Sequence, residues 1–273
     1  RVDPIRSLTD YDRENLSDPF NVPHYAQDIF DYYRKRESLF PISDYIQRQP
    51  ELTEAMRMIL VDWLVEIQEN FELNHETLYQ AVKITDLYLD RTRVSKTNLQ
   101  LVGSTALFLA CKFDERIPPC ADDFLYICDD AYTRDQLVEM EQKLLKTLNF
   151  DIGMPLSYRY VRRYAKATKS SMDTLTLARY ILEASLMFYE FVSISDCKLA
   201  AAAFLLALRM KNLGPWTSIH ELYSGFSAAD LEALVGRLNT MVKKLPSNST
   251  VTTIYSKYSH EVFFGVAKTP PLP

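Results

Sequence analysis

Residues 56–67 read Met-Arg-Met-Ile-Leu-Val-Asp-Trp-Leu-Val-Glu-Ile, and this stretch decides the fold. On a helical wheel at about 100° per residue, it shows two apolar arcs on nearly opposite sides. The larger arc consists of Met56, Ile59, Leu60, Trp63, Leu64 and Ile67, and the smaller arc consists of Met58, Val61 and Val65. A helix that is apolar nearly all round is either fully buried or partly covered by a partner. The first alternative predicts a central core helix in a helical protein.

The second alternative concerns one edge of the larger arc. Met56, Ile59 and Trp63 border the carboxylates Asp62 and Glu66 on the wheel. Apolar anchors beside carboxylates suit a short peptide that carries basic and leucine-like residues. Both interpretations of these residues, core surface and exposed docking strip, stay open at this point.

Arg57 is a charged residue within this apolar surface. A buried guanidinium needs a carboxylate, because an unpaired buried charge costs several kcal/mol. On the next expected helix, Asp86 shares a face with Leu78, Val82 and Leu89. We therefore predict a buried ion pair between Arg57 and Asp86 that fixes how the two helices cross.

The composition favours an all-α fold. Among 273 residues there are six glycines, whereas the usual frequency of roughly 7% would give about 19. Glycine supplies the turns of β-hairpins and phosphate-binding loops, so its shortage argues against β-sandwiches, dinucleotide folds and P-loop enzymes. Capping patterns beginning at Thr133 and Ser227 mark helix starts. The periodicity predicts helices near residues 24–36, 53–70, 75–90, 96–113, 119–128, 134–149, 156–168, 173–190, 196–212, 218–224, 228–244 and 250–259.

A weak internal repeat predicts two copies of one helical unit. With a shift of 98 residues, Leu101 matches Leu199, and the small residues 102–105 fall on the alanines 200–203. We expect two tandem five-helix units, each built around a core helix of small residues. The expected division is an N-terminal segment and helix at 1–52, a first unit at 53–152, a second unit with a C-terminal helix at 153–264, and a tail at 265–273.

Charge and cysteine usage exclude several classes of function. The formal net charge is −5 and no Lys/Arg cluster occurs, so we expect no nucleic-acid partner. No run of 18 apolar residues occurs and no apolar leader follows Arg1, so we expect neither a membrane span nor a secretory signal. The four cysteines have no CxxC spacing, which is typical of reduced thiols inside cells. We expect an intracellular protein.

No constellation for catalysis stands out in the sequence. The four histidines lack partners at metal-ligand spacing, and the GxSxG, GxxxxGK[ST] and calcium-loop patterns are missing. We therefore expect no enzyme activity, no metal and no cofactor.

Lys112 and Glu141 are further candidates for a functional pair. On spacing alone they are more simply surface charges near ordinary core residues. With the shift of 98, however, Lys112 falls on Met210 and Glu141 on Asn239. These charges therefore belong to the first unit and not to the shared scaffold.

Residues 56–66 resemble the cyclin-box signature of mitotic cyclins. The likeness continues, in the same order, through 99–103, Lys112-Phe113-Asp114-Glu115-Arg116-Ile117-Pro118-Pro119, 126–130, Glu141 and 148–151. It covers roughly residues 22–264. Within that family, residues 156–166 and 257–264 are most similar to B-type cyclins, in particular to the third B subgroup. Two departures, Asp114-Glu115 for the commoner Glu-Glu and Met58 for a usual alanine, leave the resemblance intact.

The resemblance implies two tandem cyclin boxes and a regulatory subunit that activates a cyclin-dependent serine/threonine kinase. The residues implied to bind the kinase are Tyr25, Ile29, Tyr32, Leu109, Lys112, Phe113, Glu141, Leu145, Phe150 and Ile152. The residues implied to dock substrate or inhibitor proteins with basic-x-leucine motifs are Met56, Ile59, Leu60, Trp63, Glu66, Leu99 and Gln100. The competing hypothesis is an adaptor of the transcription machinery with the same fold. Such an adaptor would need a basic face, which the charge balance does not supply.

Overall fold

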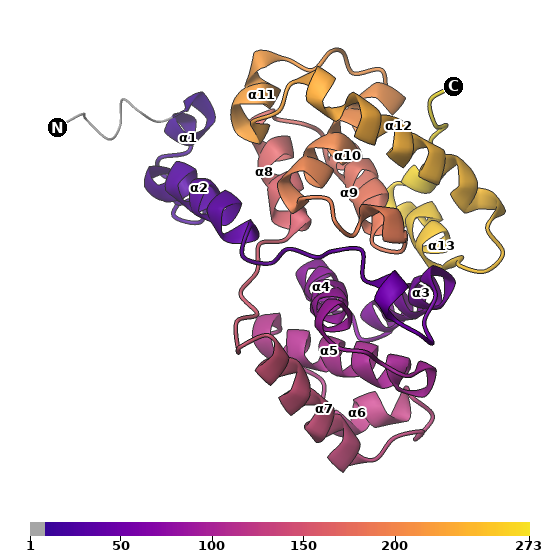
Figure 1. Ribbon diagram of the computed structural model, residues 1–273. Coiled ribbons are helices and arrows are strands. Elements are labelled where there is room, and N and C mark those ends of the chain that lie inside the picture. The colour runs from indigo at the N-terminus through magenta and orange to yellow at the C-terminus, as the bar shows by residue number, and fades with distance from the viewer. Residues whose placement is uncertain (1–8) are drawn as a thin grey trace.

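The computed structural model describes residues 9–273, and all regular elements in this range are helical. Residues 1–8, where the expectations about a leader and about the start of the N-terminal segment fall, lie outside the described residues. Figure 1 shows two groups of helices, one above the other, joined by the N-terminal segment that runs between them. The all-α prediction with two helical units is confirmed.

The described chain contains thirteen α-helices. The first bundle consists of α3 (Glu54–Asn70), α4 (His75–Arg91), α5 (Leu99–Asp114), α6 (Ala121–Tyr126) and α7 (Arg134–Thr147). The second bundle consists of α8 (Ser157–Ala167), α9 (Met172–Ser185), α10 (Asp196–Met210), α11 (Ser218–Ser224) and α12 (Ala228–Lys244). The helices α1 (Asp10–Glu14) and α2 (Ala26–Glu37) precede the bundles, and α13 (Thr253–Ser259) follows them.

Each of the twelve expected helices has a counterpart, and the capping boxes at Thr133 and Ser227 are present. One helix lies outside these expectations, and one expected helix end was wrong. The five-residue α1 was not expected, because it is too short to show a periodic pattern. The helix expected to reach residue 190 ends at Ser185. The Arg57 guanidinium donates hydrogen bonds to the carbonyls of Leu186 and Met187 at 2.9 and 3.2 Å. These carbonyls therefore accept from Arg57 and not from the backbone N–H groups of a continuing α-helix.

The bundles are built around α5 and α10, which carry the small residues of the internal repeat. All residues from Leu101 to Cys111 are buried, and so are the four alanines 200–203. A Cβ atom added to Gly103 would lie 2.7 Å from Leu60 Cδ1. The missing side chain at Gly103 therefore lets α3 cross close to α5.

Arg57 and Asp86 form the predicted ion pair between α3 and α4. The guanidinium donates two hydrogen bonds to the carboxylate, with Nε–Oδ1 and Nη2–Oδ2 distances of 2.6 and 2.7 Å. Both side chains are buried, and the Tyr45 hydroxyl donates to Asp86 at 2.6 Å. Since Arg57 also binds the chain after α9, this pair joins the two bundles as well as the two helices.

The C-terminal helix α13 packs against α3 of the first bundle. The Asp62 carboxylate accepts hydrogen bonds from the Thr253 backbone N–H and hydroxyl at 3.2 and 2.9 Å. Four residues later, the buried Lys257 ammonium lies 2.5 Å from Glu183 of α9 and 2.6 Å from Gln68 of α3. The end of the chain thus links both bundles a second time.

The close approach at Gly103 can be tested by overpacking it. We expect Gly103→Val to lower the free energy of unfolding by about 1–3 kcal/mol, because the new atoms collide with Leu60. The control is Gly236→Val on the exposed face of α12, where nothing lies within 4 Å of an added Cβ. That variant should change stability by less than about 0.5 kcal/mol. Urea unfolding followed by circular dichroism measures both, and equal losses would contradict the close-approach argument.

The ion pair at the junction can be tested by removing its carboxylate. We expect Asp86→Ala to lower the free energy of unfolding by about 3–5 kcal/mol, because Arg57 is left buried and unpaired. Asp90→Ala is the matched control on the same helix. Asp90 pairs with the exposed Arg48 at 2.7 Å, so its loss should cost about 1 kcal/mol. An unchanged melting temperature for Asp86→Ala would refute the structural role of the pair.

Candidate protein-binding surfaces

The first surface is centred on Lys112, near the end of α5, and Glu141 in α7. The two side chains form an ion pair, and their exposed fractions are 39% and 14%. The Lys112 ammonium also lies 4.3 Å from the centre of the Phe108 ring. A paired but accessible lysine and glutamate can exchange their mutual contact for hydrogen bonds to a partner's backbone or side chains.

Apolar side chains surround this ion pair. Phe113 and Phe150 are 55% and 67% exposed, whereas Leu109 and Ile152 are buried and Leu145 is partly buried. Phe150 follows α7 in the left-handed region, with φ of 58°, and its backbone N–H donates to the carbonyl of Leu145 at 2.8 Å. This turn directs a large aromatic residue outward. The arrangement combines exposed aromatic rims with an apolar floor.

The second element of this surface is α2. The Arg36 guanidinium forms an ion pair with Asp151 and donates to the carbonyl of Gly153 at 2.8 Å. A Cβ added to Gly153 would lie 3.6 Å from Arg36 and 4.0 Å from Phe113. The C-terminal end of α2 is therefore held beside the exposed aromatic ring of Phe113.

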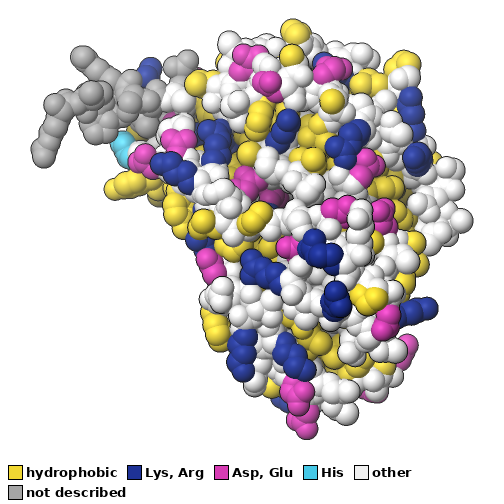
Figure 2. All heavy atoms as spheres, in the orientation of Figure 1, with side chains coloured by type: hydrophobic (Ala, Val, Ile, Leu, Met, Phe, Trp, Pro, Cys, Tyr) yellow, Lys and Arg dark blue, Asp and Glu magenta, His cyan; other side chains and the backbone are white. Residues whose placement is uncertain are grey.

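The opposite side of α2 packs on the second bundle. Phe30 and Tyr33 lie 5.9 and 6.4 Å from the buried ring of Tyr160, centre to centre. This packing leaves Tyr25 and Tyr32 exposed at 62% and 55%. Ile29, between them on the same face, is partly buried. Figure 2 shows hydrophobic side chains gathered on the molecular surface over α2.

A buried ion pair fastens the start of the described chain to the second bundle. Arg163 of α8 donates to both carboxylate oxygens of Asp12 in α1, at 2.7 and 2.6 Å. The hydroxyl of Tyr223 donates to Thr9 at 2.6 Å, and Arg34 of α2 donates to the carbonyl of Tyr223 at 2.7 Å. The orientation of α2 is therefore fixed from both of its ends.

The sequence did not predict these anchoring contacts. Asp151 and Arg163 occurred in stretches that resemble the family, but nothing local gave them a role. Their partners, Arg36 and Asp12, are 115 and 151 positions away. A contact of this kind depends on the docking of α1 and α2 and has no periodic signal.

The second surface is the strip on α3. Ile59 is 50% exposed, Met56 and Trp63 are partly buried, and Glu66 is exposed. Beneath them Leu60 and Leu99 are buried, and Gln100 is partly buried. The outer residues of the strip are therefore accessible, and the residues beneath them belong to the core. The docking interpretation describes the outer residues, and the core interpretation describes those beneath.

The environment of Asp62 differs from the expectation. Its carboxylate was expected to flank the strip, but it binds the first turn of α13 through Thr253. Burial raises the pKa of Asp62, while the hydrogen bonds from Thr253 act in the opposite direction. Glu66 is thus the carboxylate beside the strip that stays open to a basic ligand.

Two further features of residues 9–273 bear on membranes and metal ions. None of the helices within residues 9–273 is long and apolar enough to cross a bilayer. In the same range, no group of three or more His, Cys, Asp or Glu side chains is arranged to hold a metal ion. All four cysteines are free thiols, with Cys120 exposed and the other three buried.

Comparison with protein families assigns the two bundles. Residues 28–153 match the N-terminal domain of cyclins and residues 155–272 match the C-terminal domain. The chain belongs to the cyclin family. The resemblance first noted at residues 56–66 is confirmed, and the first and second bundles are the two cyclin boxes.

Known proteins support the B-type resemblance as well. The chain is 52% identical over 271 residues to a chicken (Gallus gallus) protein named G2/mitotic-specific cyclin-B3, covering 99% of this chain and 67% of that protein. The Drosophila melanogaster protein of the same name is 54% identical, over 99% of this chain and 48% of that protein. The Caenorhabditis elegans protein of the same name is 48% identical, over 100% of this chain and 72% of that protein. The chain thus spans from about half to three quarters of the length of these three relatives.

Solved structures share the fold. A viral cyclin from herpesvirus saimiri has a TM-score of 0.67 at 23% identity, over 84% of this chain and 99% of its own. A chain of the yeast RNA polymerase II CTD kinase complex CTDK-1 has a TM-score of 0.61 at 16% identity, over 80% of this chain and 72% of its own. At these identities the likeness concerns the arrangement of helices.

Proposed function

We propose that the chain is the regulatory subunit of a mitotic cyclin-dependent serine/threonine kinase, which it binds and activates to control progress through mitosis and meiosis. Membership in the cyclin family and the names of the cyclin-B3 relatives support this proposal. Its proposed location is the nucleus and the cytoplasm. The chain itself performs no chemistry in this proposal.

The observation that carries the proposal is the accessible Lys112–Glu141 pair beside exposed aromatic rings. In the proposed complex, Lys112 and Glu141 bind the backbone before the kinase's mobile helix. An apolar residue of that helix enters the space between Phe113 and Phe150, over Leu109. Tyr25, just before α2, and Ile29 and Tyr32 of α2 extend the same interface. Aromatic side chains that are buried at the centre of a protein–protein interface often contribute most of its binding free energy.

Activation then follows from differential binding. A kinase of this class needs an ion pair between a lysine of its β-sheet and a glutamate of its mobile helix. The chain binds the kinase state in which that helix is turned inward, and it binds the other state poorly. Binding energy therefore shifts the kinase population towards the active state.

The α3 strip is the proposed second contact, made with substrates or inhibitors. Met56, Ile59 and Trp63 would receive the leucine-like residue of a docking motif, and Glu66 would pair with its basic residue. The strip and the Lys112–Glu141 surface use different elements, so docking and activation are separable functions.

A reconstitution experiment with purified proteins tests the proposal directly. The purified chain is added to a purified cell-cycle kinase, and phosphorylation of a histone substrate is measured. We expect a stable complex and stimulation of at least about 100-fold. The absence of both with every cell-cycle kinase tried would overturn the proposal.

Charge reversal at Glu141 separates kinase binding from folding. We expect Glu141→Arg to weaken kinase binding roughly 100-fold, because it places two cations where a paired acid and base should meet the kinase. The control is Glu139→Arg on the same helix, at an exposed position 3.8 Å from Lys143. It makes the same change of charge and should leave binding within about twofold. Titration calorimetry measures both, and equal losses would contradict the assignment of this surface.

Truncation on α3 separates docking from activation. We expect Trp63→Ala to leave the phosphorylation of a short peptide unchanged and to weaken that of a substrate with a basic-x-leucine motif about tenfold in kcat/KM. Leu222→Ala is the matched control, since Leu222 is 62% exposed on α11. If Trp63→Ala reduced both activities equally, the two-surface model would be wrong.

A further inference from the structure

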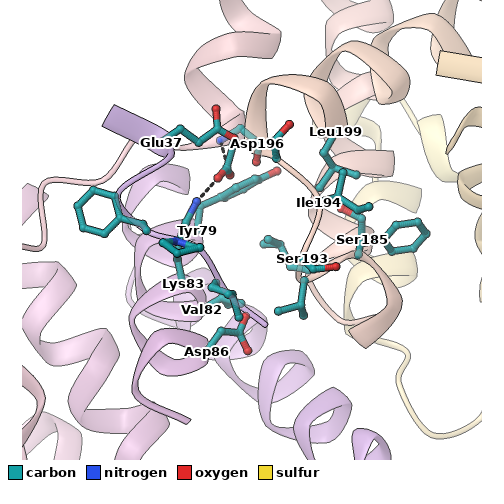
Figure 3. Close-up of a pocket in the computed structure, with 18 of the residues that line it drawn as sticks. Glu37, Tyr79, Val82, Lys83, Asp86, Ser185, Ser193, Ile194, Asp196 and Leu199 are labelled. Carbon is teal, nitrogen blue, oxygen red and sulfur yellow. Dashed lines mark hydrogen bonds and ion pairs between the residues drawn. The ribbon is translucent and has the colours of Figure 1, made fainter. Parts of the chain in front are cut away.

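A cavity of the described chain lies at the junction of the two boxes, and none of its lining residues belongs to either set of proposed binding residues. Its volume is about 350 Å³, within the range of roughly 300–1,000 Å³ typical of small-molecule sites. The C-terminal end of α2, the face of α4, and the segment between α9 and α10 form its walls. In Figure 3, Tyr79, Lys83 and Asp196 face Ile194 and Leu199 across the open space.

Two buried hydroxyl groups in the wall lack hydrogen bonds. Tyr79 and Ser157 are 2% and 1% exposed, and neither hydroxyl has a partner among the described residues. Both side chains line the cavity. A buried hydroxyl without a partner costs free energy, so such groups generally serve a ligand or a bound water. These two hydroxyls give the cavity wall two polar groups that are free to hydrogen-bond to a bound molecule.

The charges around the cavity cancel. Its charged lining residues are three bases and three acids: Arg34, Arg57 and Lys83, and Glu37, Asp86 and Asp196. Arg57 is paired with Asp86, and Lys83 with Asp196. Burial and the neighbouring Asp196 raise the pKa of Glu37, while Lys83 acts in the opposite direction. Arg34 lies 3.5 Å from Asp31, and Glu37 accepts hydrogen bonds from the Tyr160 hydroxyl and the Cys197 backbone N–H. An ion entering this space would therefore meet charged groups that already have partners, and it would lose its hydration.

Apolar groups and four further serines, Ser38, Ser185, Ser193 and Ser195, make up the rest of the wall. Val82 of α4 and Leu199 of α10 are buried, and Ile194 of the connecting segment is partly buried. Phe40 and Phe191 add two aromatic rings. This lining suits the flat or branched body of an organic molecule, with the two hydroxyls oriented towards its polar atoms.

We propose that the cavity between the boxes binds an uncharged organic small molecule, with an apolar body and an amide or hydroxyl group that hydrogen-bonds to Tyr79 and Ser157. The site does not depend on the kinase-binding or docking surfaces. Its occupancy is measured on the chain alone, so the result stands whether or not the chain activates a kinase.

Three indole compounds of similar shape serve as probes. Indole-3-acetamide is uncharged, indole-3-acetate is an anion and tryptamine is a cation at pH 7. We expect the acetamide to bind the full chain with a dissociation constant of about 1 mM or below. Each charged compound should bind at least about tenfold more weakly. Amide NMR shifts measure affinity and report which residues respond.

Two variants locate the binding. Ile194→Trp fills the cavity and should abolish acetamide binding, whereas Ile219→Trp, at a 51% exposed position on α11, should leave it unchanged. Tyr79→Phe removes one hydroxyl, so it should weaken binding about fivefold without lowering the melting temperature. This variant keeps the proposal testable if Ile194→Trp does not fold.

Several outcomes would overturn the inference. Equal affinity for the three compounds would show that charge does not select the ligand. Unchanged binding in both Ile194→Trp and Tyr79→Phe would place the probe elsewhere. No binding of any probe at its solubility limit would leave the cavity as a site for water alone.

Discussion

Arg57 donates hydrogen bonds to a helix of the first box and to the chain of the second box, at the point where the boxes meet. Its guanidinium binds the Asp86 carboxylate of α4 and the carbonyls of Leu186 and Met187 after α9. The carboxylate in turn accepts from Tyr45, in the segment that runs between the boxes. A charge buried this deeply is tolerated only while these partners are in place. The pair therefore makes the crossing of α3 and α4 and the docking of the second box parts of one arrangement.

Both proposed surfaces depend on that arrangement. α3 presents the docking strip on one side and Arg57 on another, so the junction orients the strip. α2 reaches the surface proposed to bind a kinase because Arg36 contacts Asp151 and Gly153, at the connection between the boxes. Since the opposite side of α2 rests on Tyr160 of the second box, a change in how the boxes meet would move Tyr25 and Tyr32 relative to Phe113. A rigid junction is thus a condition for the proposed kinase interface to be a single, continuous surface.

The sequence predicted contacts between neighbouring helices and missed contacts between distant ones. Arg57 and Asp86 were paired because they lie on apolar faces of consecutive helices, which must be neighbours. Periodicity also located the helices, because a helix that is buried on one face has apolar residues every three or four positions. The pair of Lys257 and Glu183 follows no such rule, since it requires α13 to return across both boxes. Exposure was equally hard to predict: Ile59 and Leu60 are adjacent and apolar, yet only the first is open to solvent.

The internal repeat shows how the two boxes differ at one pair of equivalent positions. At the position equivalent to Glu141, the second box has Asn239, which is 8% exposed and exchanges two hydrogen bonds with the backbone of Leu272, at 3.0 and 2.9 Å. At the position equivalent to Lys112 it has Met210, which is buried. The chain's own C-terminal tail thus satisfies the polar side chain that the second box carries at this position. In the first box the same position keeps a charged, accessible pair. Duplication supplied two equivalent positions, and the difference in side chains and covering segments leaves one of them available to another protein.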